Sequence, residues 1–303
     1  MSAFNACFGD SLSKADNELQ QPMAFYRDNH PVAPEDFEAP PTGKVCVLVH
    51  GLGCNESLWN FPKRYEGGSY GELLERRCGY MPLYLRFNSG LRISDNGEWL
   101  AGLLERFCVR HDTTVSELLL IGHSMGGLVI RSACHLACEA GRNWVSRVRH
   151  VIYLGSPHLG APLEKATNVA THVLGLFDTT ATRVIRDVLN ARSVGVKDLR
   201  FGNLVDQDWL DCDPDELMKN RRVPIPWPAD MRHHRVVGQA LPTVGTLGDT
   251  VVRPESAAGR AHGAQPGAPG GSDVRVMPGL DHMALARHPG VFEHIERWVT
   301  EDG

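Results

Sequence analysis

The chain has 303 residues, of which 42% are hydrophobic and 22% charged, and its formal net charge is −5. This apolar content is enough to bury a substantial core, and a single large α/β domain can occupy most of the length. The slightly acidic balance argues against a nucleic-acid-binding protein, which usually carries a basic stripe, and against a polybasic membrane-surface protein.

The first 43 residues are polar and contain several prolines, so we predict an N-terminal arm (1–43) ahead of one main domain (44–303). The arm has neither the basic nor the apolar region of a secretory signal, and no run in the chain approaches the roughly 18 apolar residues of a membrane span. The eight cysteines are scattered, without a C-x-x-C pair or zinc-ligand spacing. This pattern favours reduced, buried thiols, and we therefore expect a cytoplasmic protein.

From residue 44 onward, apolar segments of strand length alternate with segments of helical periodicity, at a spacing of roughly thirty residues. The strands are predicted within 45–49, 81–88, 117–121, 149–160, 234–241 and 273–279. The helices are predicted over 70–78, behind a cap at Ser94, from 128 onward and after Pro289. Such alternation is typical of βαβ units, so we expect a mostly parallel central sheet flanked by helices.

The alternation is interrupted at about 163–228, where the sequence predicts several helices and then a proline-rich end. We interpret this stretch as a helical cap inserted over a face of the sheet. Its apolar side chains either face the site or form the packing of the cap itself. They are Leu174, Leu176, Phe177, Val184, Ile185, Val188 and Leu189. Residues 257–272 are rich in Gly, Ala and Pro, which predicts a flexible surface loop.

The pentapeptide Gly122-His123-Ser124-Met125-Gly126 fits the pattern G-x-S-x-G, which in α/β-hydrolases forms the turn that carries a nucleophilic serine. An apolar strand precedes it and a helical pattern follows it, as this turn requires. Side chains at Gly122 or Gly126 would collide with neighbouring elements, and the helix N-terminus favours developing negative charge. The motif predicts Ser124 as the nucleophile; the alternative is an inert serine in a glycine-rich turn.

His282 is the predicted general base. In α/β-hydrolases the catalytic residues follow the order serine, acid, histidine, and the histidine comes after the last strand. His282 meets both conditions, whereas His288 lies beyond that loop and His262 lies in the Gly-rich segment. The alternative for His282 is a capping or surface histidine.

Asp249, in the segment LGDTVV after the strand over 234–241, is the predicted acid. A carboxylate at this place could hold the imidazole in the required tautomer and stabilise the imidazolium. The rivals are Asp230, which precedes that strand, Asp273, which opens the last strand, and Asp281, which adjoins His282. The alternative for Asp249 is an aspartate that only shapes a turn.

The segment HGLG closes the first predicted strand, and its glycines, Gly51 among them, let the backbone approach a substrate. An oxyanion hole needs two N–H donors directed at the developing charge. We assign these donors to the backbone N–H groups of Leu52 and Met125. The alternative is an ordinary glycine-rich turn between strand and loop.

Together the segments HGLG, GHSMGG, YLGSPHLGAP, LGDTVV and GLDHMAL resemble the α/β-hydrolase lipases and esterases, in particular bacterial lipases and hydrolases similar to the GPI inositol-deacylase. The resemblance runs from about 45 to 299 and is weakest over 163–230. It implies the α/β-hydrolase fold with a cap, Ser124, Asp249 and His282 as a triad, an ester substrate and no required cofactor. The chain departs from the pattern in lacking a secretory signal and in having Thr250 where many relatives have glycine.

These residues predict acyl transfer through an acyl-enzyme, on a small hydrophobic ester. A thioester, a polyester oligomer or another acyl acceptor would use the same triad, whereas a non-catalytic binding protein would typically have lost a triad member. No metal site is predicted, because the adjacent His233 and His234 should point to opposite faces of their strand. The sequence does not predict the oligomeric state.

Overall fold

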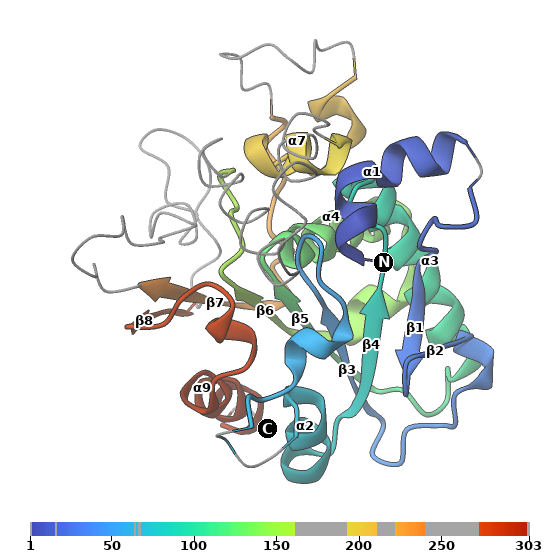
Figure 1. Cartoon of the computed structure of the whole chain (residues 1–303). Helices are drawn as coiled ribbons and strands as arrows, with labels where there is room; N and C mark the ends of the chain where they lie inside the picture. The colour runs from blue at the N-terminus through green and yellow to red at the C-terminus, as the bar shows by residue number, and fades with distance from the viewer. Residues whose placement is uncertain are drawn as a thin grey trace.

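The computed structural model describes residues 2–15, 17–63, 65, 68–160, 193–210, 222–239 and 273–301. Within them lies an eight-stranded sheet in the order β2-β1-β4-β3-β5-β6-β7-β8, with helices on both faces (Figure 1). The strands are β1 (Ala24–Arg27), β2 (His30–Val32), β3 (Lys44–Val49), β4 (Met81–Arg86), β5 (Glu117–His123), β6 (Val148–Leu154), β7 (Arg232–Gln239) and β8 (Asp273–Pro278).

The sheet is mostly parallel, as the alternating pattern predicts. Every neighbouring pair from β4 to β8 is parallel, while β1 runs antiparallel to both β2 and β4. From β3 the chain adds β4 on one side and then β5 on the other, so the strand order reverses at β3. Ligand sites of open α/β sheets form outside the carboxyl ends of the strands at such a point.

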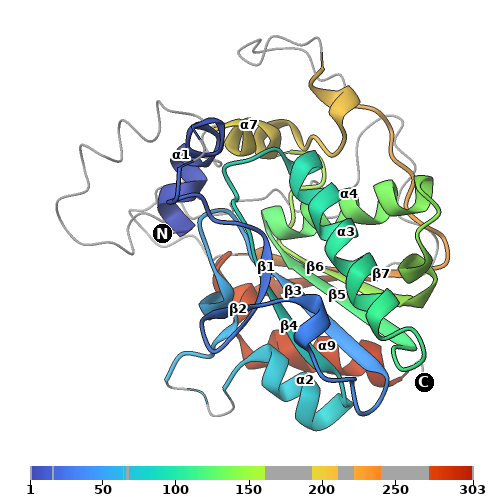
Figure 2. The same ribbon diagram turned by 90° about the vertical axis from the view of Figure 1, so that its right-hand side faces the viewer.

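The helices lie in two layers, with α2 and α9 on one face of the sheet and α3 and α4 on the other (Figure 2). Two further helices, α1 and α7, lie beyond the carboxyl ends of the central strands (Figure 1). The bounds are α1 (Ser2–Lys14), α2 (Tyr70–Cys78), α3 (Ile93–Arg110), α4 (Met125–Glu139), α7 (Val194–Phe201) and α9 (Pro289–Thr300). Among the described residues, no helix is both long and apolar enough to cross a membrane.

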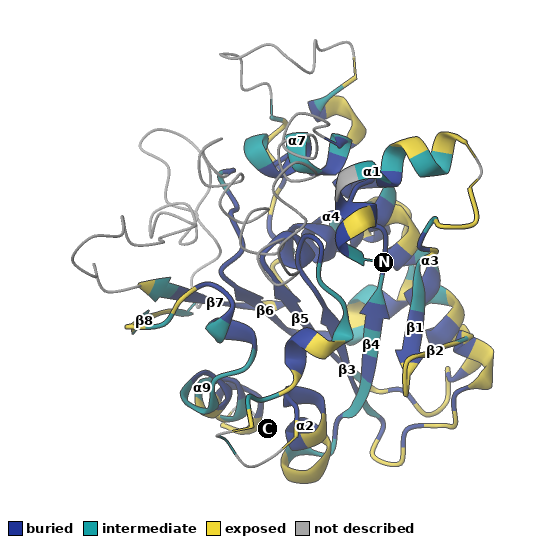
Figure 3. Ribbon diagram, viewed as in Figure 1, coloured by how far each residue is buried: buried dark blue, intermediate teal, exposed yellow. Residues whose placement is uncertain are grey.

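The central strands are buried on both faces, which explains their continuous apolar sequences. In β3, Val45, Val47 and Val49 pack into the cluster under α3 and α4. Cys46 and Leu48, at alternate positions, pack into the cluster under α2 and α9. The strands at the two edges, β2 and β8, are more exposed (Figure 3).

The segment predicted as an N-terminal arm contributes two strands to this sheet, so residue 43 is not a boundary between the arm and the sheet. Phe25 on β1 is fully buried, and its ring contacts those of Phe37 and Phe107 at centroid distances of 6.0 and 6.2 Å. The strands have only four and three residues, and β2 contains a proline, so their sequence gives little strand signal.

The predicted cap at Ser94 is wrong, because α3 begins one residue earlier and its N-cap is Arg92, which makes no side-chain cap bond. The cap comes instead from Asp198 on α7, whose Oδ2 accepts a hydrogen bond of 3.0 Å from the Ile93 N–H. Oδ1 of the same carboxylate accepts from Arg92 at 2.7 Å. Helix α7 lies within the predicted cap insertion, whose residues 163–192 and 211–221 are outside the described residues.

Candidate active site

Ser124 occupies the turn between β5 and α4 in a strained backbone conformation, with φ 52° and ψ −121°. A residue other than glycine at positive φ costs of the order of 1–3 kcal/mol and persists only where its surroundings enforce it. Here the Ser124 N–H donates to the Leu154 carbonyl at 2.9 Å, and the Ser124 carbonyl accepts from Gly127 at 3.1 Å. The turn is therefore fixed by β6 on one side and by the first turn of α4 on the other.

The two glycines of the motif lie where the chain leaves no room for a side chain. A Cβ atom on Gly122 would lie 2.5 Å from the Gly127 Cα. A Cβ atom on Gly126 would collide with the carbonyl oxygens of Val49 and His50, at the end of β3. The turn thus packs directly against the loop that follows β3.

The loop that carries Leu52 and the start of α4 both adjoin this turn. A Cβ atom on Gly51 would lie 3.1 Å from the Ser124 Cβ, so the loop after β3 lies against the serine. Leu52, the next residue, is buried. Met125 is the first residue of α4, and the N–H groups of a first helical turn have no partner within the helix. The loop after β3 and the first turn of α4 therefore both border Ser124.

His50 is a buried part of this loop that the sequence analysis did not single out. Its Nδ1 lies 2.8 Å from the Gly51 carbonyl, and its ring stacks on Phe87 at a centroid distance of 4.4 Å. Its Nε2 accepts a hydrogen bond of 3.4 Å from the Phe87 N–H, so Nδ1 carries the proton and donates. Burial lowers the pKa of His50 to about 4, which keeps the ring neutral. The only sequence signal was its place before a glycine at a strand end.

His282 lies after β8, and the structure brings it to the serine turn. A Cβ atom on Gly155 would lie 2.9 Å from the His282 Nδ1, and Gly155 directly follows Leu154, the acceptor for the Ser124 N–H. The side chain is buried, with 8% of its surface exposed. The ring therefore lies next to the end of β6, one residue from a backbone contact of the serine.

His123 connects the serine turn to the histidine loop. Its Nε2 lies 2.9 Å from the His282 carbonyl, and the two rings are 4.7 Å apart. A carbonyl only accepts, so Nε2 carries the proton, and burial lowers the pKa of His123 to about 4. Sequence reasoning missed this role, because the position before the serine can hold any residue in the motif.

Three of the rivals for base and acid, His288, Asp281 and Asp273, have other partners. Nδ1 of His288 accepts from the Gly290 N–H at 3.1 Å and caps α9. Asp281 accepts from the Ala284 N–H at 2.8 Å, and Asp273 accepts from the Trp298 indole at 2.9 Å. Asp249 and His262 lie outside the described residues, and Asp249 remains a prediction from its motif.

His233 and His234 point to opposite faces of β7, as strand alternation predicts. His233 lies 3.2 Å from the Tyr153 hydroxyl, on the α4 side of the sheet. His234 lies 3.0 Å from His150 and stacks on Trp298 of α9 at 4.4 Å, on the other side. The rings therefore cannot chelate one ion together. No group of three or more potential metal ligands occurs within the described residues.

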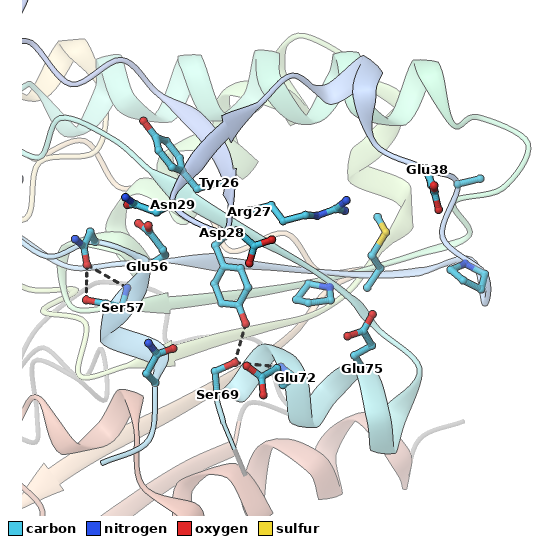
Figure 4. A pocket seen from close by; sticks show the side chains of 17 residues that line it. Tyr26, Arg27, Asp28, Asn29, Glu38, Glu56, Ser57, Ser69, Glu72 and Glu75 are labelled. Atoms are coloured by element: carbon cyan, nitrogen blue, oxygen red, sulfur yellow. Dashed lines mark hydrogen bonds between the residues drawn. The ribbon is translucent and has the colours of Figure 1, made fainter. Parts of the chain in front are cut away.

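A separate groove of about 800 Å³ lies at the edge of the sheet formed by β1 and β2, next to α2 (Figure 4). Several carboxylates line it, among them Asp28, Glu56 and Glu72. Neither Ser124 nor His282 lines this groove, so it is not part of the candidate active site.

Comparisons with known proteins agree with this architecture. The sheet order and the strand–turn–helix around the serine define an α/β-hydrolase fold. The family model of the PGAP1-like alpha/beta domain matches residues 85–214, a range that contains the serine turn. The motif-based resemblance is thereby confirmed. A comparison with curated proteins finds no match.

Solved structures, among them a lipase and an esterase, share the fold at low sequence identity. The Bacillus licheniformis lipase BlEst2 superposes with a TM-score of 0.54 at 19% identity, covering 87% of this chain and 94% of that one. A Pyrococcus furiosus esterase gives a TM-score of 0.51 at 11% identity, covering 87% of this chain and 83% of that one. RedJ gives 0.50 at 20% identity, covering 90% and 98%. At such identities the likeness establishes the fold alone.

Proposed function

We propose that the protein is a serine hydrolase of carboxylic esters, with Ser124 as nucleophile, His282 as general base and Asp249 as the acid that orients it. The observation that carries the proposal is the strained backbone of Ser124 at the carboxyl end of β5. Strained backbone conformations of this kind cluster at active sites. Two neighbours support the proposal: the loop of Gly51 lies against the serine, and the ring of His282 lies against Gly155, which follows the acceptor for the Ser124 N–H.

The proposed reaction is acyl transfer in two halves. His282 takes the hydroxyl proton as Ser124 Oγ attacks the ester carbonyl, and the N–H groups of Leu52 and Met125 stabilise the resulting oxyanion. The C–O bond to the alcohol breaks, and the alcohol leaves with the proton from His282. Water then attacks the acyl-enzyme in the same way and releases the carboxylic acid and Ser124.

The substrate class in this proposal is a small-molecule ester with an apolar acyl or alcohol part. Lipases and esterases of the same fold support an ester substrate. The apolar sequence of the insertion at about 163–228 supports a hydrophobic group; the seven apolar side chains named for it all lie outside the described residues. No metal or cofactor has a part in the proposed chemistry. Location in the cytoplasm stays a prediction from the sequence.

The test is hydrolysis of p-nitrophenyl esters from acetate to palmitate by the wild type and by Ser124→Ala. We expect a maximum at short or medium chains in the wild type and loss of the burst of p-nitrophenol in Ser124→Ala, with the fold unchanged by circular dichroism. A fluorophosphonate probe should label the wild type only. Activity on acyl-CoA alone would redirect the proposal to a thioesterase, and equal hydrolysis by Ser124→Ala would refute the role of Ser124.

A further inference from the structure

The loop after β4 makes a direct contact with the candidate oxyanion loop. Ser89 is 1% exposed, and its hydroxyl oxygen accepts a hydrogen bond of 2.9 Å from the Gly53 N–H. Gly53 is buried, adopts φ 67° and directly follows Leu52, the proposed oxyanion donor. The Ser89 hydroxyl thus fixes the peptide next to the proposed donor.

The loop of Ser89 is itself held by two helices from distant parts of the chain. Asn88 donates from its side-chain amide to the Gly9 carbonyl of α1 at 3.2 Å. The N–H of Gly195 on α7 donates to the Gly90 carbonyl at 3.1 Å. Helices α1 and α7 lie side by side (Figure 2), so this loop is held between them and the body of the protein.

The two helices are also bonded to each other. Ser193, the N-cap of α7, donates from its hydroxyl to the Ala6 carbonyl of α1 at 2.7 Å. Asp198 of α7 caps α3 and pairs with Arg92, just beyond the loop. The support around Ser89 is therefore hydrogen-bonded on both sides and buried.

We propose that Ser89 is a positioning residue, which holds the backbone N–H of Leu52 in the geometry of the oxyanion hole, and that α1 and α7 hold Ser89 in turn. The inference rests on the proposed function. An oxyanion hole works only when its donors are fixed in place before charge develops. Loss of the Ser89 hydroxyl would leave the buried Gly53 N–H without its acceptor, and the loop would shift to satisfy it.

The test compares Ser89→Ala with Ser132→Ala, measured on the p-nitrophenyl ester that the wild type hydrolyses fastest. Ser132 is a matched control, because it is fully buried and its hydroxyl donates one hydrogen bond of 2.6 Å, to Leu204, far from the Gly53 loop in the chain. We expect Ser89→Ala to lower kcat about 10- to 100-fold with KM changed less than about twofold, since the lost contact acts in the transition state. Ser132→Ala should keep kcat within about threefold at a similar loss of stability.

Two more variants separate positioning from a structural role. Ser89→Thr keeps the hydroxyl and should retain most of the wild-type kcat. This variant tests the proposal even if Ser89→Ala folds poorly. Asn88→Asp keeps the acceptor for Gly90 but sets a carboxylate against the Gly9 carbonyl, and it should lower kcat less than Ser89→Ala does.

These experiments distinguish failure of the inference about Ser89 from failure of the proposed function. An inactive wild type, or an active Ser124→Ala, would refute that function itself. An active wild type with wild-type kcat in Ser89→Ala would overturn the inference alone, as would equal kcat losses in Ser89→Ala and Ser132→Ala or in Ser89→Ala and Ser89→Thr. Unchanged kcat in Asn88→Asp would remove α1 from the proposal.

Discussion

The two sides of the candidate site are positioned in different ways. Ser124 follows β5, a central strand buried along nearly its whole length, and backbone contacts with β6 and the end of β3 fix its turn. His282 follows β8, an edge strand with several exposed residues, and its loop is held by side chains from other elements. The nucleophile side therefore depends on backbone packing, whereas the histidine side depends on a few individual hydrogen bonds.

The largest effect of a single substitution is expected on the nucleophile side. Gly126→Ala would drive a Cβ atom into the carbonyl oxygens at the end of β3, and backbone cannot move aside as a flexible side chain can. We expect a loss of more than about 2 kcal/mol of unfolding free energy, with ester hydrolysis reduced at least about a hundredfold. Urea unfolding and the p-nitrophenyl assay measure both.

Gly102→Ala on α3 is the matched control for this change. Its added Cβ would meet only the flexible end of Arg142, at 3.5 Å, and the helical backbone gains about 0.5–1 kcal/mol from the same substitution. A Gly126→Ala protein as stable and active as Gly102→Ala would contradict the account of the serine turn.

Acidic pH should lower the stability of the fold through buried histidines on both sides of the candidate site. Burial lowers the pKa values of His50 and His123 to about 4, against about 6.5 in the unfolded chain. It lowers the pKa of His233 on β7 to about 4 as well. Between pH 6.5 and 4 only the unfolded chain gains these protons, so stability falls as the pH falls through that window and levels off above it. Each group contributes about 1.4 kcal/mol per pH unit at the steepest point.

Urea unfolding at pH 7.5, 5.5 and 4.5 measures this dependence. His233→Gln should make the slope shallower by about the contribution of one group. A stability that stays constant from pH 7.5 to 4.5 would show that these rings are not held neutral in the fold.

A smaller change is expected on the histidine side. His123→Leu removes the donor to the His282 carbonyl and should lower kcat about 10-fold, because the base is then held less firmly. His123→Gln offers an amide donor at a similar distance and should recover most of that activity. Equal losses in the two variants would show that the hydrogen bond does not position the histidine.

The sequence predicted the parts of this molecule that depend on local pattern. The buried strands around β3 and β5 have continuous apolar sequences, and the serine motif lies in the strand–turn–helix that it predicts. The cap of α3 could not be predicted, because Asp198 supplies it from more than a hundred residues away. The roles of His123 and Ser89 depend on tertiary contacts, which no spacing in the sequence encodes.

The smallest effect is expected at Tyr70, a second support of the histidine side. Its hydroxyl, fully buried on α2, lies 2.9 Å from the carbonyls of Leu285 and His288 and accepts from the His288 N–H at 3.1 Å. Tyr70→Phe would leave that N–H unpaired and should cost about 1–2 kcal/mol of stability. These contacts begin three residues after His282, whereas His123 contacts His282 itself, so kcat should fall less than in His123→Leu. A larger kcat loss in Tyr70→Phe than in His123→Leu would place the main support of the histidine on α2.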